Sequence, residues 1–279
     1  LNYLSTTRGS VHMHTAIFWL GVFVALVGFA SGNTNITETQ PSLYWAAMGD
    51  NLFINESKYA EAVDAYDKAI ALDPRNASVW YMKGYALSYM NEKDKAIEAY
   101  DKAIEINPQY ASAWNNKAYV LSTLGKYDKA IEAYDKAIEI EPTDWSRWDS
   151  KRITQERAGI KPNYHIKDFL LITDGNGITV FLSFSDENGK YILPTGKMLL
   201  CMRKSGTSTT FKRIYDIKKT DYESCVGGIA IKKWLSADEL LSYGKFRQNS
   251  RGEFSPTIQG QVFFQNENNI VFTAKTKLA

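Results

Sequence analysis

The sequence is short of cysteine, histidine and net charge, and each shortage excludes a class of protein. Its 279 residues include only 2 Cys and 3 His, and the formal net charge is +2. Two cysteines cannot build a disulfide-dense scaffold or a four-cysteine zinc site. A charge near zero gives no general attraction to nucleic acid, so we expect no nucleic-acid partner. The chain is 44% apolar and 23% charged, which is typical of a globular protein and argues against disorder or a multi-span membrane protein.

Catalytic motifs are also missing. The sequence contains no HExxH, P-loop, GxSxG or CxxC pattern. His165 is the sole histidine outside the N-terminal segment, and it lies in a predicted linker over residues 162–167. We therefore expect a protein that is not an enzyme, with no catalytic residue, no metal and no cofactor.

One long hydrophobic run lies near the N-terminus. Residues 16–30 are wholly apolar, and no charged residue occurs between Arg8 and Glu38. A helix of this length spans about 22 Å, against roughly 30 Å for a bilayer core. Its apolar side chains favour insertion by roughly 3–5 kcal/mol. The run is either a secretory signal cleaved after the small residues Gly28 and Ala30, or an uncleaved membrane anchor, which we favour.

The surroundings of this run predict an extracytoplasmic chain. Arg8 precedes the run, and the next basic residue is Lys58, so the positive-inside rule places the bulk of the chain outside the cytoplasm. Three glycosylation sequons begin at Asn35, Asn55 and Asn76, which agrees with that location. We expect a cell-membrane protein with a single N-terminal anchor or, alternatively, a secreted one.

The middle of the chain repeats itself every 34 residues. The segment Asp94–Ile106 recurs with identical sequence at Asp128–Ile140. Proline recurs at this interval as Pro74, Pro108 and Pro142. Tryptophan recurs as Trp80, Trp114 and Trp148, and tyrosine as Tyr66, Tyr100 and Tyr134. A fixed period of this length is typical of helical repeat proteins.

The repeat resembles the tetratricopeptide repeat (TPR). The second repeat matches the family pattern with Trp80, Gly84, Leu87, Ala96, Tyr100, Ala103 and Pro108. The third matches it with Trp114, Ala118, Leu121, Ala130, Tyr134, Ala137 and Pro142. The resemblance covers Leu43–Ala158 and implies three stacked helical hairpins. Residues 144–158 begin like a fourth repeat and are interpreted as a polar capping helix.

The resemblance also implies a concave groove lined by the first helix of each repeat. Its predicted residues are Tyr81, Met82, Tyr85, Tyr89, Asn115, Asn116, Tyr119 and Thr123, with Asp149 and Ile153 from the final helix. Tyrosine and methionine are enriched at interfaces, so we expect the groove to bind an extended peptide or a partner helix. The alternative is that several of the tyrosines only pack between repeats. Some TPR modules bind a C-terminal carboxylate through Lys and Asn, but Tyr81 and Tyr85 occupy those positions here.

After Gly159 the sequence changes to short β-branched and aromatic runs separated by turns. The predicted strands are Phe169–Thr173, Ile178–Phe184, Met198–Arg203, Thr210–Ile217, Val226–Trp234, Ile258–Gln265 and Ile270–Lys275. Residues 237–242 form a short helical turn, for which Ser236 and Glu239 are a predicted capping box. The strand number and spacing are similar to those of immunoglobulin-like β-sandwich modules, although no motif carries the resemblance.

Two features of the β region leave alternatives open. Cys201 and Cys225 lie on separate predicted strands, and they form either a disulfide or two buried thiols. Residues 43–159 carry 15 basic and 19 acidic side chains, whereas residues 160–279 carry 17 and 11, so the charge divides as −4 and +6. One interpretation is that the basic excess binds an anionic polymer, lipid headgroups or an acidic partner. The other, which we favour, is that it consists of solvated lysines on edge strands.

The sequence thus predicts a multidomain chain: residues 1–32 as signal peptide or anchor, 33–42 as linker, 43–159 as an all-α TPR array, and 160–279 as an all-β antiparallel sandwich. Such a protein is expected to be a membrane-anchored or secreted adaptor that binds a partner peptide or protein in the TPR groove. The alternative is a cell-envelope structural or adhesive protein in which the sandwich binds and the repeats act as a spacer.

Overall fold

The computed structural model describes residues 41–173, 177–204, 210–225, 228–242, 248, 254 and 258–277. The apolar run over residues 16–30 and the sequon at Asn35 lie outside these residues. Within the described ranges, no helix is both long enough and apolar enough to cross a membrane. The chain forms two compact units, Leu1–Pro74 and Arg75–Ala279.

The first unit contains the helices α2 (Pro41–Ile54) and α3 (Tyr59–Leu72), which form a hairpin. Gly49 brings the helices close together, because a Cβ at this position would lie 2.5 Å from a ring carbon of Tyr66. Tyr66 is fully buried, and its hydroxyl donates a hydrogen bond of 2.8 Å to Asp50. The small residue therefore lets the buried ring pack closely against the facing helix.

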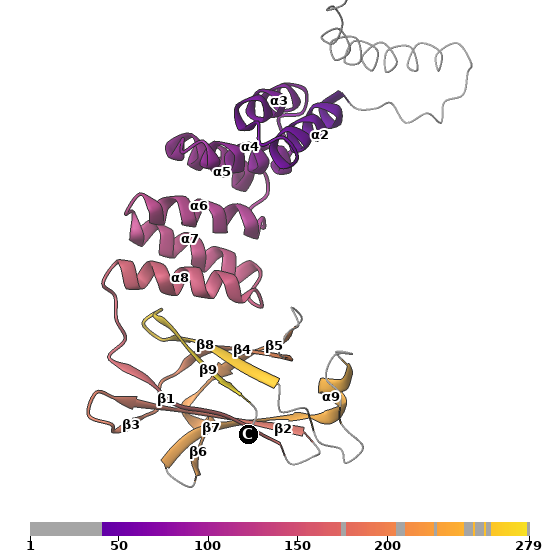
Figure 1. The fold of residues 1–279 in the computed structure, drawn as a ribbon. Helices are drawn as coiled ribbons and strands as arrows, with labels where there is room; N and C mark the ends of the chain where they lie inside the picture. The colour runs from indigo at the N-terminus through magenta and orange to yellow at the C-terminus, as the bar shows by residue number, and fades with distance from the viewer. Residues whose placement is uncertain are drawn as a thin grey trace, which may run out of the picture. The chain divides into compact units, whose positions relative to one another are not determined.

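The second unit begins with five helices, each 13 or 14 residues long. They are α4 (Ala77–Tyr89), α5 (Lys93–Ile106), α6 (Ala111–Thr123), α7 (Tyr127–Ile140) and α8 (Trp145–Arg157) (Figure 1). The contact of Gly84 with the buried Tyr100 repeats the contact of the first hairpin, and Ala118 packs with the buried Tyr134 in the next. The helices over 41–157 therefore follow the predicted repeats.

The spacing of Pro and Trp has a direct structural cause. The indole Nε1 of Trp114 donates to the carbonyl of Pro108 at 3.0 Å, and Trp148 donates to Pro142 at 2.8 Å. Each proline lies just after a helix that it cannot continue, and the tryptophan six residues later ties that turn to the following helix.

In the described part of the chain after α8, nine strands form two antiparallel sheets. The first sheet has the order β1-β2-β7-β6, with β3 paired to β2, and the second has the order β5-β4-β8-β9 (Figure 1). The strands are β1 (Tyr164–Thr173), β2 (Gly177–Asp186), β3 (Tyr191–Ile192), β4 (Gly196–Lys204), β5 (Thr210–Ile217), β6 (Tyr222–Cys225), β7 (Gly228–Ser236), β8 (Ile258–Asn266) and β9 (Val271–Lys277).

One hydrophobic core contains side chains from both sheets. Leu182 and Phe184 of β2 share it with Leu200 of β4 and with Val262 and Phe264 of β8. Because strand side chains alternate between faces, the other face of β4 and β8 remains available for a second contact. The two sheets thus agree with the predicted pairing of β layers.

The strand predictions differ from the structure at several points. β1 begins at Tyr164 rather than Phe169, so His165 lies in a strand and not in a linker. The short strands β3 and β6 were not predicted, because two and four residues are too few to show alternation. The predicted strand Val226–Trp234 is observed as β7, shifted by two residues.

The predicted capping box at α9 (Ala237–Ser242) is only half formed. The backbone N–H of Glu239 donates to the Ser236 hydroxyl at 3.2 Å, as expected. The Glu239 carboxylate instead forms an ion pair with Arg213 of β5. The helix is therefore linked to the second sheet by that side chain.

Candidate partner-binding surfaces

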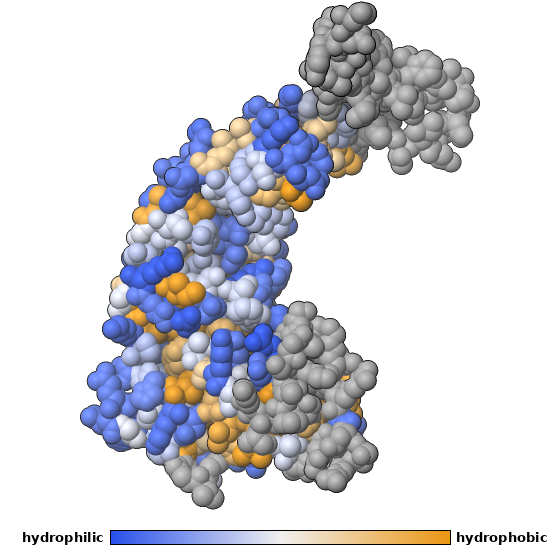
Figure 2. Space-filling view, viewed as in Figure 1, coloured by the Kyte–Doolittle hydropathy of each residue, from blue (hydrophilic) through white to orange (hydrophobic). Residues whose placement is uncertain are grey.

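The predicted groove residues lie on α4 and α6, and six of them define a surface that we call the tyrosine face. Its members are Tyr81, Tyr85 and Tyr89 of α4 and Asn115, Asn116 and Tyr119 of α6. On the face shown in Figure 2, hydrophilic residues cover most of the helical array and apolar residues form small separate patches. An aromatic cluster on such an array is therefore a distinctive surface.

The tyrosines of α4 form a continuous ladder. The rings of Tyr81 and Tyr85 are stacked with centroids 6.2 Å apart, and Tyr85 meets Tyr89 edge-on at 5.2 Å. Asn116 of α6 donates a hydrogen bond of 3.1 Å to the Tyr81 hydroxyl, and Asn115 donates to the Asn116 carbonyl oxygen at 3.2 Å. The ladder is thus fixed to α6 by amide groups.

Exposure divides the tyrosine face into supporting and accessible residues. Tyr81 is half-buried and packs against the rings of Tyr100 and Tyr110. Tyr89 and Tyr119, by contrast, are 54% and 60% exposed. The interpretation that some of these tyrosines pack between repeats therefore suits Tyr81, whereas Tyr89 and Tyr119 are accessible to a partner.

The hydroxyls of Tyr81 and Tyr85 remain protonated at neutral pH. Burial raises the pKa of Tyr81. The hydrogen bond with Tyr89 and, to a lesser extent, burial raise the pKa of Tyr85 to about 12. The tyrosine face therefore offers neutral hydroxyl and amide groups, which can donate to and accept from a peptide backbone.

The remaining predicted groove residues contribute less. Met82 is half-buried, and the exposed Thr123 donates its hydroxyl to the Val120 carbonyl of its own helix at 2.8 Å. Asp149 of α8 instead forms an ion pair with Arg152 at 2.6 Å and lines a different groove. Ile153 is 36% exposed.

The interpretation of α8 as a polar cap is wrong, because α8 packs against the second sheet. Trp148 is fully buried in a cluster with Leu199 of β4, Phe263 of β8 and Val271 of β9. On its other side, Thr154 of α8 exchanges a hydrogen bond of 3.0 Å with Ser122 of α6. The sequence showed an apolar stripe on this helix but gave no sign of which surface covers it.

A buried polar network reinforces this contact. The ammonium of Lys151, which is 0% exposed, donates to Asp135 of α7 at 2.5 Å and to the Asn269 side chain at 2.6 Å. Asn269 donates to Asp135 at 2.6 Å, and its backbone carbonyl accepts from Gln155 at 2.8 Å. Burial lowers the pKa of Lys151 more than the charge of Asp135 raises it. The network joins α7 and α8 to the turn between β8 and β9.

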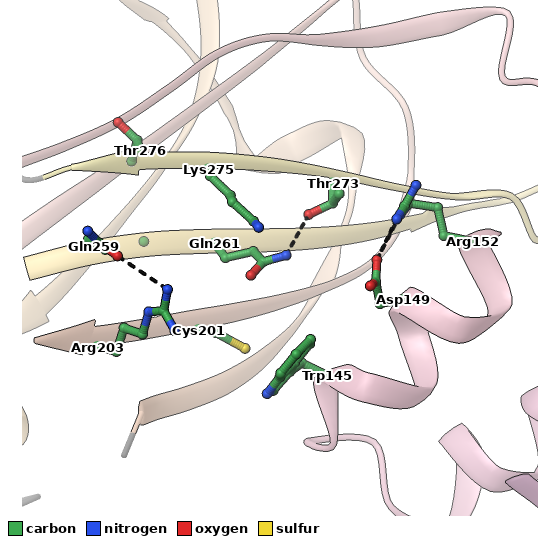
Figure 3. Close-up of a pocket in the computed structure, with 11 residues that line it drawn as sticks. Trp145, Asp149, Arg152, Cys201, Arg203, Gln259, Gln261, Thr273, Lys275 and Thr276 are labelled. Atoms are coloured by element: carbon green, nitrogen blue, oxygen red, sulfur yellow. Dashed lines mark hydrogen bonds and ion pairs between the residues drawn. The ribbon is translucent and has the colours of Figure 1, made fainter. Parts of the chain in front are cut away.

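A groove of about 690 Å³ lies where α8 leaves the outer face of the second sheet. We call it the junction groove. Figure 3 shows its two sides: Trp145, Asp149 and Arg152 project from α8, and the other residues come from β4, β8 and β9. The strand residues are Cys201, Arg203, Gln259, Gly260, Gln261, Thr273, Lys275 and Thr276. The sequence gave no signal for this groove, because its residues are spread over more than 100 positions.

Of the two alternatives for Cys201 and Cys225, a disulfide or two buried thiols, the structure excludes the disulfide, because Cys201 is a free and buried thiol. Cys201 lies in β4 of the second sheet and belongs to the cluster around Trp148, whereas Cys225 lies in β6 of the first sheet. Burial raises the pKa of Cys201 to about 12. The side chain thus serves as a small apolar group under α8.

The other single residues considered from the sequence have local roles. The Asn76 side chain caps α4 by accepting from the backbone N–H groups of Ser78 and Val79. Asn55 is exposed. The ring Nε2 of His165 lies 3.1 Å from the hydroxyl of Ser185 on the neighbouring strand. In the ranges that the structure describes, no group of three or more His, Cys, Asp and Glu is placed to hold a metal ion.

Comparison with known proteins identifies the helical array. Residues 77–110 and 111–144 match the tetratricopeptide repeat family, and residues 51–90 match a second profile described as TPR repeat. The chain is therefore a TPR repeat protein, with a β region of uncertain family after the array. No curated protein sequence matches it.

Several solved structures show partial likeness. The MamA protein is 29% identical over 48% of this chain and 69% of that one, with a TM-score of 0.41. The first TPR of Spaghetti (RPAP3), solved with the HSP90 peptide SRMEEVD, is 23% identical over 43% of this chain and 98% of that one, with a TM-score of 0.42. The Sgt2 TPR domain from Aspergillus fumigatus is 24% identical over 44% and 86%, with a TM-score of 0.41.

Proposed function

We propose that this TPR repeat protein is a non-enzymatic adaptor that binds a partner peptide or protein through the tyrosine face. The observation that carries the proposal is the pair of exposed tyrosines, Tyr89 and Tyr119, beside a hydrogen-bonded ladder on α4 and α6. Tyrosine supplies a large contact area at a small cost in side-chain entropy, and it is enriched among residues that dominate binding energy.

The support beneath the exposed rings favours binding without rearrangement. Tyr85 lies between Tyr81 and Tyr89, and Tyr81 is fixed by Asn116 and by the ring of Tyr110. A partner therefore meets side chains that are already ordered, which reduces the entropy lost on binding.

Affinity capture followed by mass spectrometry identifies the partner, and isothermal titration calorimetry then measures its affinity. We expect Tyr89→Ala/Tyr119→Ala to weaken binding at least about tenfold, as for interface residues that cost more than 1 kcal/mol. Trp234→Ala is the control, because Trp234 is an equally exposed aromatic residue on β7, outside the tyrosine face. If Tyr89→Ala/Tyr119→Ala captures the partner as well as the parent chain does, the result would contradict the proposal. Binding would then be assigned to the β region, with the repeats as a spacer.

We propose an extracytoplasmic location with an N-terminal membrane anchor. The support comes from the apolar run over residues 16–30 and the absence of basic residues between Arg8 and Lys58. Protease treatment of intact cells tests this location, and an array that is protected from the protease would contradict it.

A further inference from the structure

The outer face of the second sheet changes character along its strands. Under α8 it presents Ile214, Leu199 and Phe263, which belong to the Trp148 cluster. The strand register places Lys212, Cys201, Gln261 and Lys275 side by side in the next row, and Arg203 opposite Gln259 in the row after that. The junction groove thus begins where the apolar surface ends.

Three cations of this face matter for what it can bind. Lys212, Arg203 and Lys275 each lack a carboxylate partner among the residues that the structure describes. Among the described residues that line the groove, Asp149 is the one carboxylate, and it is already paired with Arg152 at 2.6 Å. The groove therefore carries an uncompensated positive charge, although the whole chain is close to neutral.

The groove also has an aromatic wall. Trp145 of α8 is 41% exposed, and one face of its ring is stacked on Phe263 at a centroid distance of 6.3 Å. Its free surface lies at the groove, opposite the strand residues (Figure 3). An aromatic side chain held in this way offers apolar contact area without losing further freedom.

We propose that the junction groove is a docking site for an acidic peptide segment. Arg203 and Lys275 bind its carboxylates, and Trp145 packs against an apolar side chain between them. Gln259 already accepts a hydrogen bond from Arg203 at 3.4 Å, and Gln261 donates one to Thr273 at 3.3 Å. The amide N–H groups of Gln259 and the amide oxygen of Gln261 are then the groups offered to the peptide backbone. Of the proposed contacts, the one between Arg203 and a peptide carboxylate is the best matched, since a guanidinium donates two parallel hydrogen bonds to a carboxylate.

The arrangement of charged and amide groups in the groove favours a peptide over a single small acid. Its 690 Å³ lies in the range of about 300–1,000 Å³ typical of ligand sites. Its cations lie on two different strands, β4 and β9, with the amides of β8 between them. A ligand that uses all of these groups needs at least two separated carboxylates and polar groups in between.

This site is additional to the tyrosine face and uses none of its residues. A phage-displayed library of random peptides, panned on the full chain, supplies the probes. An enriched acidic peptide is then synthesised with fluorescein, and its binding is measured by fluorescence anisotropy. We expect enrichment of sequences in which Asp or Glu flank an apolar residue.

Charge reversal at the groove is the decisive variant. Arg203→Glu/Lys275→Glu changes two exposed side chains, and we expect binding of the acidic peptide to weaken about tenfold or more. Lys161→Glu/Lys190→Glu makes the same charge change at exposed sites outside the groove and should leave binding within about twofold. Trp145→Ala should also weaken binding, and higher salt should reduce the affinity.

Two results would overturn the proposal. One is an acidic peptide that binds the Arg203→Glu/Lys275→Glu variant as tightly as the parent chain. The other is a library that yields no acidic peptide while polygalacturonate binds the groove, which would make the ligand an anionic polysaccharide. Tyr89→Ala/Tyr119→Ala separates this site from the tyrosine face, because that variant should bind the acidic peptide normally.

Discussion

Lys151→Met should destabilise the contact between α8 and the second sheet by about 2–4 kcal/mol. Lys151 is fully buried and donates two charge-assisted hydrogen bonds, of 2.5 Å to Asp135 and 2.6 Å to Asn269. Each such bond contributes about 1.5–3 kcal/mol. Asp135 is 29% exposed, so water takes over part of the lost interaction and the estimate falls below the sum of about 3–6 kcal/mol for the two bonds.

The same structure predicts that a second substitution restores stability. Burial lowers the pKa of Lys151 despite the neighbouring carboxylate, so desolvation of its ammonium outweighs the attraction of Asp135. Lys151→Met/Asp135→Asn removes both charges, and the carbonyl oxygen of the introduced amide can still accept the hydrogen bond that Asn269 donates. We expect the double variant to be within about 1 kcal/mol of the parent chain.

Urea unfolding, followed by circular dichroism and tryptophan fluorescence, measures both variants. Lys136→Met is the matched control on α7, since Lys136 is 59% exposed and pairs only with Glu139. We expect it to change stability by less than about 0.5 kcal/mol. A cost below that value for Lys151→Met, or a double variant weaker than the single one, would refute the reasoning.

Two further predictions concern Trp148 and Cys201. Trp148→Phe should cost more stability than Trp114→Phe in urea unfolding, because both lose a hydrogen bond to a proline carbonyl but Trp148 is fully buried; equal costs would contradict the assigned packing. In a Cys225→Ser background, Cys201 should react with iodoacetamide at pH 8 only after unfolding, because its pKa of about 12 keeps the thiol protonated; rapid native labelling would show that it is accessible. The folded state should also lose stability above about pH 8.5, where the unfolded thiol begins to ionise.

The repeats could be predicted in detail because each is a local pattern. Tyr66, Tyr100 and Tyr134 recur every 34 residues, and the small residues Gly84 and Ala118 have the same spacing, so the sequence alone identified the repeat fold. The tyrosine face followed from the same register. The division of this face into supporting and accessible residues could not be predicted from that register. The burial of Tyr81 depends on contact with Tyr110, just before α6.

The β region and the junction could be predicted only in part. Long strands such as β2 and β8 show alternation, whereas β6 has four residues and shows none. The contact between Lys151 and Asn269 joins residues 118 positions apart, and no periodicity marks such a pair. A lysine on a helix predicts a solvated side chain, so its burial follows only from the tertiary structure.

The double-sided packing of α8 limits where this protein can gain length during evolution. One side of α8 meets a preceding repeat through Ser122, and the other meets the second sheet through Trp148 and Lys151. Duplication of a 34-residue unit before α6 would preserve both contacts. Duplication after α8 would place an ordinary repeat against a surface shaped for Trp148, so new units are expected to accumulate on the N-terminal side.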